Sequence, residues 1–219
     1  MNFTYRTVWV LSNLFFGTYC RRRFCNPERV PATGPAILAA NHASFFDPPL
    51  VGAGLQRTIC YLARDTLYTN PLLTTVLHQL NTIPVDREGG GAKGLKAIMD
   101  RLTGGAAIIL FPEGTRTHDG QFRPARAGIG LLVAKSQCPV IPIRIFGSYE
   151  AFSRHHRVPR PHQMIVKYGR PLWFRELRAE TQTCSKPRLK AIYQQIADEL
   201  MFQIGKLQPG TDKETPSMV

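Results

Sequence analysis

Short apolar runs bounded by glycine or proline alternate with segments of helical periodicity along most of the chain. This alternation is typical of an α/β protein, in which strands and helices are interleaved around one central sheet. The apolar runs predict strands at residues 36–40, 58–62, 83–85, 106–111, 140–146 and 164–168. We therefore expect a single α/β domain with a mixed central sheet flanked by helices.

Three segments carry apolar residues at helical spacing. The clearest begins at Asn70-Pro71, where an asparagine can cap a helix whose first turn contains proline. The apolar positions are 73, 76, 77 and 80 in this segment, 95, 98, 99 and 102 in the second, and 189, 192, 193, 196 and 200 near the C-terminus. Such stripes predict helices that pack on a core and do not indicate cofactor sites.

The N-terminal segment is apolar over residues 7–19, which include no charged side chain, and Arg21, Arg22 and Arg23 follow at once. This stretch is shorter than the ~20 residues that cross a bilayer. A signal peptide is disfavoured because the basic residues follow the apolar run and no small-residue cleavage site is evident. We expect an amphipathic helix that lies along the membrane interface, and a plain core helix is the alternative.

The charge balance is strongly basic. The 219 residues include 28 Lys and Arg against 15 Asp and Glu, which gives a formal net charge of +13. Such an excess favours an anionic partner, either nucleic acid or a negatively charged lipid surface. The apolar N-terminal segment favours lipid, so we expect an anionic membrane surface and no nucleic acid.

Metal and disulfide chemistry are not indicated. The five cysteines are odd in number and scattered, without a Cys-x-x-Cys pair. His155 and His156 lie in a basic, proline-containing stretch at 153–160, which is typical of a solvated loop. We therefore expect no metal site.

A first cluster of polar residues follows directly on the strand expected at 36–40. His42 and Asp47 are five residues apart, which on a helix would place them about 140° apart, so they can meet only through a turn. Asp47-Pro48 is typical of a helix start with Asp47 as N-cap, and this is the simple alternative to a catalytic role. A carboxylate bonded to one imidazole nitrogen makes the other nitrogen a better base. Ser44 lacks the Gly-x-Ser-x-Gly surroundings of a nucleophile.

Two further clusters also follow expected strands. The block Phe-Pro-Glu-Gly-Thr-Arg at 111–116 contains Glu113 and Arg116, and an arginine fork of this kind can bind phosphate. Its alternative is a surface turn with an ion pair. The strand at 83–85 leads into Asp86-Arg87, a second candidate phosphate ligand, and a glycine run at 89–91. The P-loop pattern is absent, so nucleotide binding is weakly supported.

Together, four ordered blocks resemble the 1-acylglycerol-3-phosphate acyltransferase family over residues 36–146. The blocks are Asn41-His42 with Asp47, Val85-Asp86-Arg87, Phe-Pro-Glu-Gly-Thr-Arg at 111–116, and Val-Ile-Pro-Ile at 140–143. His-x-x-x-x-Asp alone is common by chance, but the third block is much rarer. The order and separation of the blocks identify the chain as a member of this family.

We expect the chain to divide into an interfacial anchor at 1–24, an acyltransferase domain at 25–207 and a flexible tail at 208–219, the tail because it contains proline and glycine and few apolar residues. The resemblance implies a donor that is acyl-CoA or acyl carrier protein, and an acceptor that is a lysophospholipid, 1-acyl-sn-glycerol 3-phosphate, with phosphatidic acid as product. No metal or organic cofactor is implied. The location implied is the cytoplasmic face of the cell membrane, as a monotopic or peripheral protein.

The resemblance also assigns roles to residues. His42 is the general base that deprotonates the acceptor hydroxyl, and Asp47 stabilises the imidazolium that forms, so no acyl-enzyme is required. The substrate-binding positions implied are Arg87, Glu113, Gly114, Thr115, Arg116 and Pro142. The arginines would bind phosphate, the backbone at 114–115 would line the pocket, and Pro142 would shape the floor of the acyl site. A proline that ends hydrogen bonding in a strand is the alternative for Pro142.

Two departures from the family pattern bear on the acceptor pocket. Asn81 stands where many relatives have glycine, and asparagine tolerates a left-handed backbone better than most residues. Thr117 replaces a frequent serine. Alternatives that stay open are another lysophospholipid, glycerol 3-phosphate or an ornithine-type lysolipid as acceptor, a thioesterase, and a non-catalytic lipid-binding module.

Overall fold

The computed structural model describes residues 1–85 and 92–210. Within this part of the chain the strands are β1 (Arg23–Cys25), β2 (Ala36–Ala40), β3 (Ile59–Arg64), β4 (Thr82–Val85), β5 (Ala107–Leu110), β6 (Val140–Phe146) and β7 (Ile165–Tyr168). They form one sheet in the order β1-β7-β6-β2-β5-β3-β4. Neighbouring strands are parallel except β6 and β7, so the sheet is mixed, as the sequence predicts.

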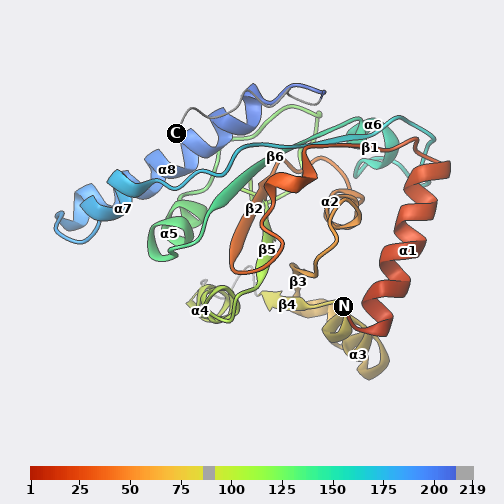
Figure 1. The fold of residues 1–219 in the computed structure, drawn as a ribbon, viewed down its shortest axis with the longest axis horizontal. Coiled ribbons are helices and arrows are strands. Elements are labelled where there is room, and N and C mark those ends of the chain that lie inside the picture. The colour runs from red at the N-terminus through yellow and green to blue at the C-terminus, as the bar shows by residue number, and fades with distance from the viewer. Residues whose placement is uncertain (86–91, 211–219) are drawn as a thin grey trace.

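Helices cover both faces of this sheet (Figure 1). Their bounds are α1 (Phe3–Thr18), α2 (Asp47–Ala53), α3 (Pro71–Gln79), α4 (Ala92–Thr103), α5 (Ala127–Lys135), α6 (Ser148–Phe152), α7 (Arg175–Glu180) and α8 (Lys186–Lys206). Side chains of α4, α5 and α8 build the core on one face, and side chains of α1 and α2 build the core on the other.

Strand β2 is the centre of the molecule because all five of its residues are buried. Leu38 and Ala40 face the core beneath α1 and α2, whereas Ile37 and Ala39 face the core beneath α5 and α8. A strand buried on both faces reads as a continuous apolar run, which is why its bounds could be predicted. Because β5 and β6 run parallel to β2, the segments that follow these three strands leave from the same edge of the sheet.

The predicted elements are confirmed, with shifts of a few residues at their ends. Asn70 caps α3, since its side chain accepts hydrogen bonds from the backbone N–H groups of Leu72 and Leu73. Asn81 has a φ of 56°, so it adopts the left-handed backbone that its replacement of glycine suggested. β1 was not predicted, because it has only three residues and begins inside the arginine run.

The expected boundary after residue 24 falls inside β1. The preceding helix is also joined to the domain. Tyr5 and Phe16 of α1 are buried, and the Trp9 indole N–H donates to the carbonyl of Leu55 at 2.9 Å. Residues 1–24 are therefore part of the fold, although the outer face of α1 is exposed and apolar.

Two other expectations concern the ends of the chain. Across residues 1–85 and 92–210, no helix combines the length and apolar character needed to span a bilayer. Of the tail expected at 208–219, the part from residue 211 lies outside the described residues.

Two glycines of α5 provide a matched test of the packing between α5 and α8. A Cβ at Gly130 would collide with the backbone of Tyr193 in α8, whereas a Cβ at Gly128 would meet no atom within 4 Å. We expect Gly130→Ala to lower the free energy of unfolding by about 1–3 kcal/mol through overpacking. Gly128→Ala should leave it unchanged or raise it by up to about 1 kcal/mol. Urea denaturation measures both values, and equal free energies of unfolding for the two variants would contradict this account.

Candidate active site

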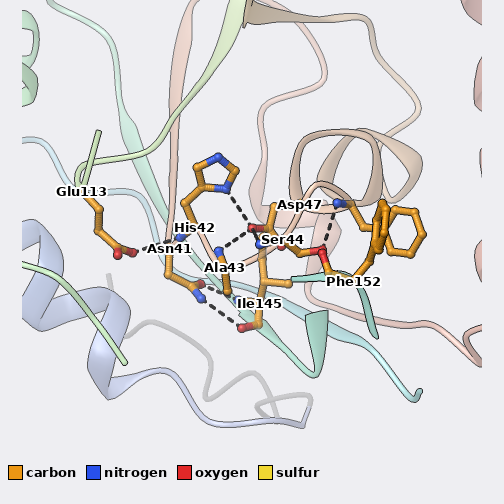
Figure 2. Close-up of polar contacts among 9 residues, drawn as sticks. Asn41, His42, Ala43, Ser44, Asp47, Glu113, Ile145 and Phe152 are labelled. Carbon is orange, nitrogen blue, oxygen red and sulfur yellow. Dashed lines mark hydrogen bonds and ion pairs between the residues drawn. The ribbon is translucent and has the colours of Figure 1, made fainter. Parts of the chain in front are cut away.

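The first polar cluster forms the turn between β2 and α2. Because α2 begins at Asp47 and is preceded by Phe46, the expectation that Asp47 is the N-cap is wrong. Its carboxylate points back toward the end of β2 instead of capping its own helix (Figure 2). The turn therefore brings His42 and Asp47 together, as their spacing required.

One oxygen of Asp47 organises this turn. Its Oδ2 accepts hydrogen bonds from Nδ1 of His42 at 2.9 Å and from the backbone N–H groups of Ala43 at 2.6 Å and Ser44 at 2.7 Å (Figure 2). A carboxylate accepts, so Nδ1 carries the proton and Nε2 of the neutral ring has a free lone pair. Asp47 is fully buried, while the side chain of His42 is 12% exposed. The arrangement leaves Nε2 as the ring nitrogen that can accept a proton.

Glu113 holds the same turn from the neighbouring strand. It follows β5, and its Oε1 accepts from the backbone N–H of His42 at 2.9 Å (Figure 2). Its Oε2 accepts from the backbone N–H of Arg123 at 3.2 Å. In this structure both carboxylate oxygens are thus bonded to the protein's own backbone. The observed contacts of Glu113 position His42, a role that the sequence reasoning missed.

The environment of Glu113 raises the pKa of its carboxyl group to about 7. Burial is the main cause, because removal from water disfavours the charged form. The backbone N–H groups of His42 and Arg123 lower the pKa, and the nearby negative charge of Asp47 raises it. Glu113 therefore changes its charge near neutral pH, next to the candidate base.

Two further contacts fix His42, and its neighbour Asn41 is bonded to β6. The ring of His42 stacks on Phe111, with ring centroids 3.9 Å apart, and the His42 backbone carbonyl accepts from the N–H of Thr117 at 2.9 Å. The side chain of Asn41 bonds both the carbonyl and the N–H of Ile145 in β6 (Figure 2). The position of Phe111, as the first residue of the third block, was the available signal for its role.

Ser44 has a structural role in this turn. Its hydroxyl donates to the carbonyl of Phe152 at 2.7 Å and accepts from the N–H of Phe46 at 3.0 Å (Figure 2). Its oxygen is thus occupied in closing the turn, in agreement with the absence of a nucleophile motif.

The third block follows β5 beside this turn. Gly114 has a φ of +70°, and a Cβ there would lie 2.8 Å from the Arg126 side chain, so glycine is required both for the backbone and for the space. Thr115 is half-buried, and Arg116 places its guanidinium 3.4 Å above the ring of Phe45. The cation–π contact orients Arg116 at the rim of the turn.

Pro142 and Arg87 are the remaining expected residues. Pro142 is an interior residue of β6, on the face of Val140, where it contacts Gly169. His42 stacks on Phe111, which packs against the core on the opposite face of the sheet. Arg87 lies outside the described residues. Within the described ranges, all five cysteines are free and no group of three or more His, Cys, Asp or Glu is placed to hold a metal ion.

A family model described as acyltransferase matches residues 21–146, which includes the His42–Asp47 turn and the third block. The chain belongs to the acyltransferase family. The resemblance drawn from the four blocks is thereby confirmed at the level of the family.

Curated relatives of this acyltransferase carry a more specific name. A 1-acyl-sn-glycerol-3-phosphate acyltransferase of Bacillus subtilis (strain 168) is 28% identical over 148 residues, 67% of this chain and 71% of the relative. The enzyme of the same name from Helicobacter pylori (strain J99 / ATCC 700824) is 29% identical over 161 residues, 68% of each chain.

A solved structure agrees with the fold of this acyltransferase. The crystal structure of the 1-acyl-sn-glycerophosphate (LPA) acyltransferase PlsC from Thermotoga maritima superposes with a TM-score of 0.71. It covers 94% of this chain and 81% of the PlsC chain at 20% identity. The mixed sheet with its flanking helices is therefore shared.

The raised pKa of Glu113 predicts a pH-dependent stability. The folded state holds this proton up to about pH 7, whereas an unfolded chain loses it near 4.5, so ionisation opposes folding. The free energy of unfolding should fall by about 3 kcal/mol as pH rises through this window. In urea titrations from pH 5 to 8, Glu113→Gln should no longer show this decrease in the free energy of unfolding. Asp100→Asn, which removes an exposed carboxylate of α4, is the control, and identical pH profiles for wild type and Glu113→Gln would contradict the prediction.

Proposed function

We propose that this acyltransferase moves a fatty acyl group from acyl-CoA or acyl carrier protein to the free hydroxyl of 1-acyl-sn-glycerol 3-phosphate, giving phosphatidic acid. The single observation that supports it most is the hydrogen bond between Asp47 and Nδ1 of His42, which makes Nε2 the basic nitrogen of the ring. The acceptor is suggested by the names of the relatives from Bacillus subtilis and Helicobacter pylori.

In the proposed mechanism, Nε2 of His42 takes the proton of the acceptor hydroxyl as its oxygen attacks the thioester carbonyl. Asp47 stabilises the resulting imidazolium through the 2.9 Å hydrogen bond to Nδ1. Collapse of the tetrahedral intermediate breaks the C–S bond, and the imidazolium returns the proton to the leaving thiolate. The acyl group passes directly between substrates, with no acyl-enzyme.

The acceptor phosphate would be bound at the rim of the turn by Arg116, together with Arg87. Arg116 is suited to this role because the ring of Phe45 beneath its guanidinium fixes the plane of the fork. The backbone at Gly114 and Thr115 would line the pocket. Glu113 would act on the acceptor indirectly, by holding the backbone of His42.

An apolar cavity offers room for an acyl chain. It has a volume of about 210 Å³ and lies between α1, α2 and β3. Pro48 and Pro49 line it directly after Asp47, and Trp9 and Tyr61 complete its apolar wall. We infer that part of an acyl chain is held there, because a thioester carbonyl near His42 needs a nearby apolar space for its chain.

The membrane-facing part of the proposal rests on α1. Its outer face exposes Val10, Leu11, Leu14 and Phe15, and the exposed fraction of Leu14 is 61%. A surface helix normally turns polar side chains outward, so an apolar outer face favours the membrane interface over water. We place the protein on the cytoplasmic side of the cell membrane, as a monotopic or peripheral protein.

The central experiment incubates the purified protein in detergent micelles with a long-chain acyl-CoA and lysophosphatidic acid, and follows CoA release and lipid product. We expect phosphatidic acid from wild type and a loss of at least about 10³-fold in kcat for His42→Ala, because the general base is removed. Asp47→Asn should lower kcat by about 10²–10⁴-fold, because the wrong tautomer of His42 would be favoured.

The alternatives give different products in the same assay. Release of free fatty acid without lipid product would favour a thioesterase, in which His42 activates water. Products from glycerol 3-phosphate or another lysolipid, but not from lysophosphatidic acid, would change the acceptor. Binding of lysolipid without turnover of any acyl-CoA or acyl carrier protein donor would favour a lipid-binding module.

The apolar face of α1 is tested by Leu11→Gln/Leu14→Gln, which leaves the buried residues of the helix in place. We expect the fraction bound to vesicles in a flotation assay to fall at least about 10-fold, since apolar burial of about 1.5–3 kcal/mol per leucine is lost. Phe202→Gln, on the exposed face of α8, is the control and should bind as wild type does. Full vesicle binding by the α1 variant would refute the anchor.

A further inference from the structure

Two segments far apart in the sequence share one unusual composition. Neither residues 1–27 nor residues 151–170 contain an aspartate or glutamate. In a chain with 15 acidic residues, both segments therefore carry basic charge without local neutralisation. The exposed arginines are Arg6, Arg21 and Arg23 in the first segment, and Arg154, Arg157, Arg160 and Arg170 in the second.

The fold joins these segments into one surface. The Tyr19 hydroxyl, just beyond α1, donates to the carbonyl of Pro159 at 3.0 Å. The N–H of Met164 donates to the carbonyl of Cys20, and β1 then pairs in parallel with β7. The loop at 154–162 is thus fixed against the C-terminal end of α1, next to the exposed apolar face of that helix.

A cavity lies at this junction. It measures about 570 Å³ and is lined by Thr18, Tyr19, Arg21, Pro161, His162 and Gln163. Its wall combines a guanidinium, an imidazole and hydroxyl groups, which together suit an anionic, hydrogen-bonding ligand. Farther along the loop, the nearby charge of Arg154 is the main cause of a lowered pKa of His118, which is consistent with a positive potential here.

The loop is also connected to the catalytic turn. The carbonyl of Phe152, at the end of α6, accepts hydrogen bonds from the Ser44 hydroxyl and the Phe45 N–H. The ring of Phe152 contacts those of Phe45 and Phe46, and Phe46 contacts Phe15 of α1. The basic loop, the apolar face of α1 and the His42 turn therefore form one continuous region.

We propose that the exposed arginines of loop 154–162 and Arg21 bind anionic lipid headgroups, so that the loop and α1 together hold the catalytic turn at the bilayer surface. This inference rests on the proposed function and extends it, because it names a second contact with the membrane and the lipid charge that contact selects. The apolar face of α1 supplies insertion, and the loop supplies charge-dependent affinity.

An acidic acyl carrier protein would also be attracted to a basic loop, but two observations favour lipid. Val158, between the arginines, has an exposed fraction of 67%, so the loop presents an apolar residue together with its charges. The loop also continues into the apolar face of α1 through the Tyr19–Pro159 hydrogen bond. A surface that mixes arginines with exposed apolar side chains is suited to headgroups above an acyl layer.

The test compares Arg157→Gln/Arg160→Gln with Lys186→Gln/Lys190→Gln. The control pair lies on α8, whose N-terminal end is at the opposite end of the molecule from α1, and removes the same charge (Figure 1). Flotation is measured with phosphatidylcholine vesicles that contain or lack phosphatidylglycerol. We expect the loop variant to lose about 10- to 30-fold in partitioning to the anionic vesicles alone, with a weaker salt dependence, and the control to change less than about twofold.

Other outcomes overturn the proposal. Equal losses of vesicle binding in the loop and control variants would assign the effect to net charge. If the loop variant lost no vesicle binding, the loop would not be a membrane contact. A loop variant that floats normally but loses kcat/KM only with acyl carrier protein as donor would assign the loop to the carrier. The acyltransferase activity of the loop variant in detergent micelles should be unchanged. Flotation needs no turnover, so a failure of the proposed chemistry would not alter the flotation result, and the two proposals can fail separately.

Discussion

A single buried oxygen, Oδ2 of Asp47, accepts three N–H groups, and the geometry of the site depends on it. A buried carboxylate is tolerated only when donors replace its lost water. The backbone N–H groups of Ala43 and Ser44 supply two of them, which forces the chain to fold back between β2 and α2. The third donor is the ring of His42, so the hydrogen bond that replaces water at the carboxylate also sets the tautomer of the ring.

The parallel sheet provides the second constraint. Because β2 and β5 are adjacent and run the same way, the catalytic turn and the third block emerge side by side. Glu113 can therefore reach the backbone of His42 from a segment 71 residues away. His42 is then held by carboxylates from two loops, one at its ring and one at its backbone. The mixed character of the sheet arises farther out, where β7 turns back along β6.

The sequence predicted what local pattern controls. Buried strands such as β2 were recognisable because both of their faces are apolar, and Asn81 followed from the backbone preference of asparagine. β1 escaped because its three residues owe their conformation to pairing with β7, a long-range contact. The direction of the Asp47 side chain, the backbone contacts of Glu113 and the position of Pro142 depend on tertiary packing, which a motif does not encode.

The aromatic contacts between α1 and the catalytic turn have an evolutionary consequence. Phe15 and Phe16 both pack on Phe46, which lies in the chain between His42 and Asp47. In a close-packed interior, a change of ring size on one side leaves a void or a clash on the other. A change of ring size in α1 at this contact would therefore need a matching change at position 46, so the N-terminal helix shares part of the packing constraint on the catalytic motif.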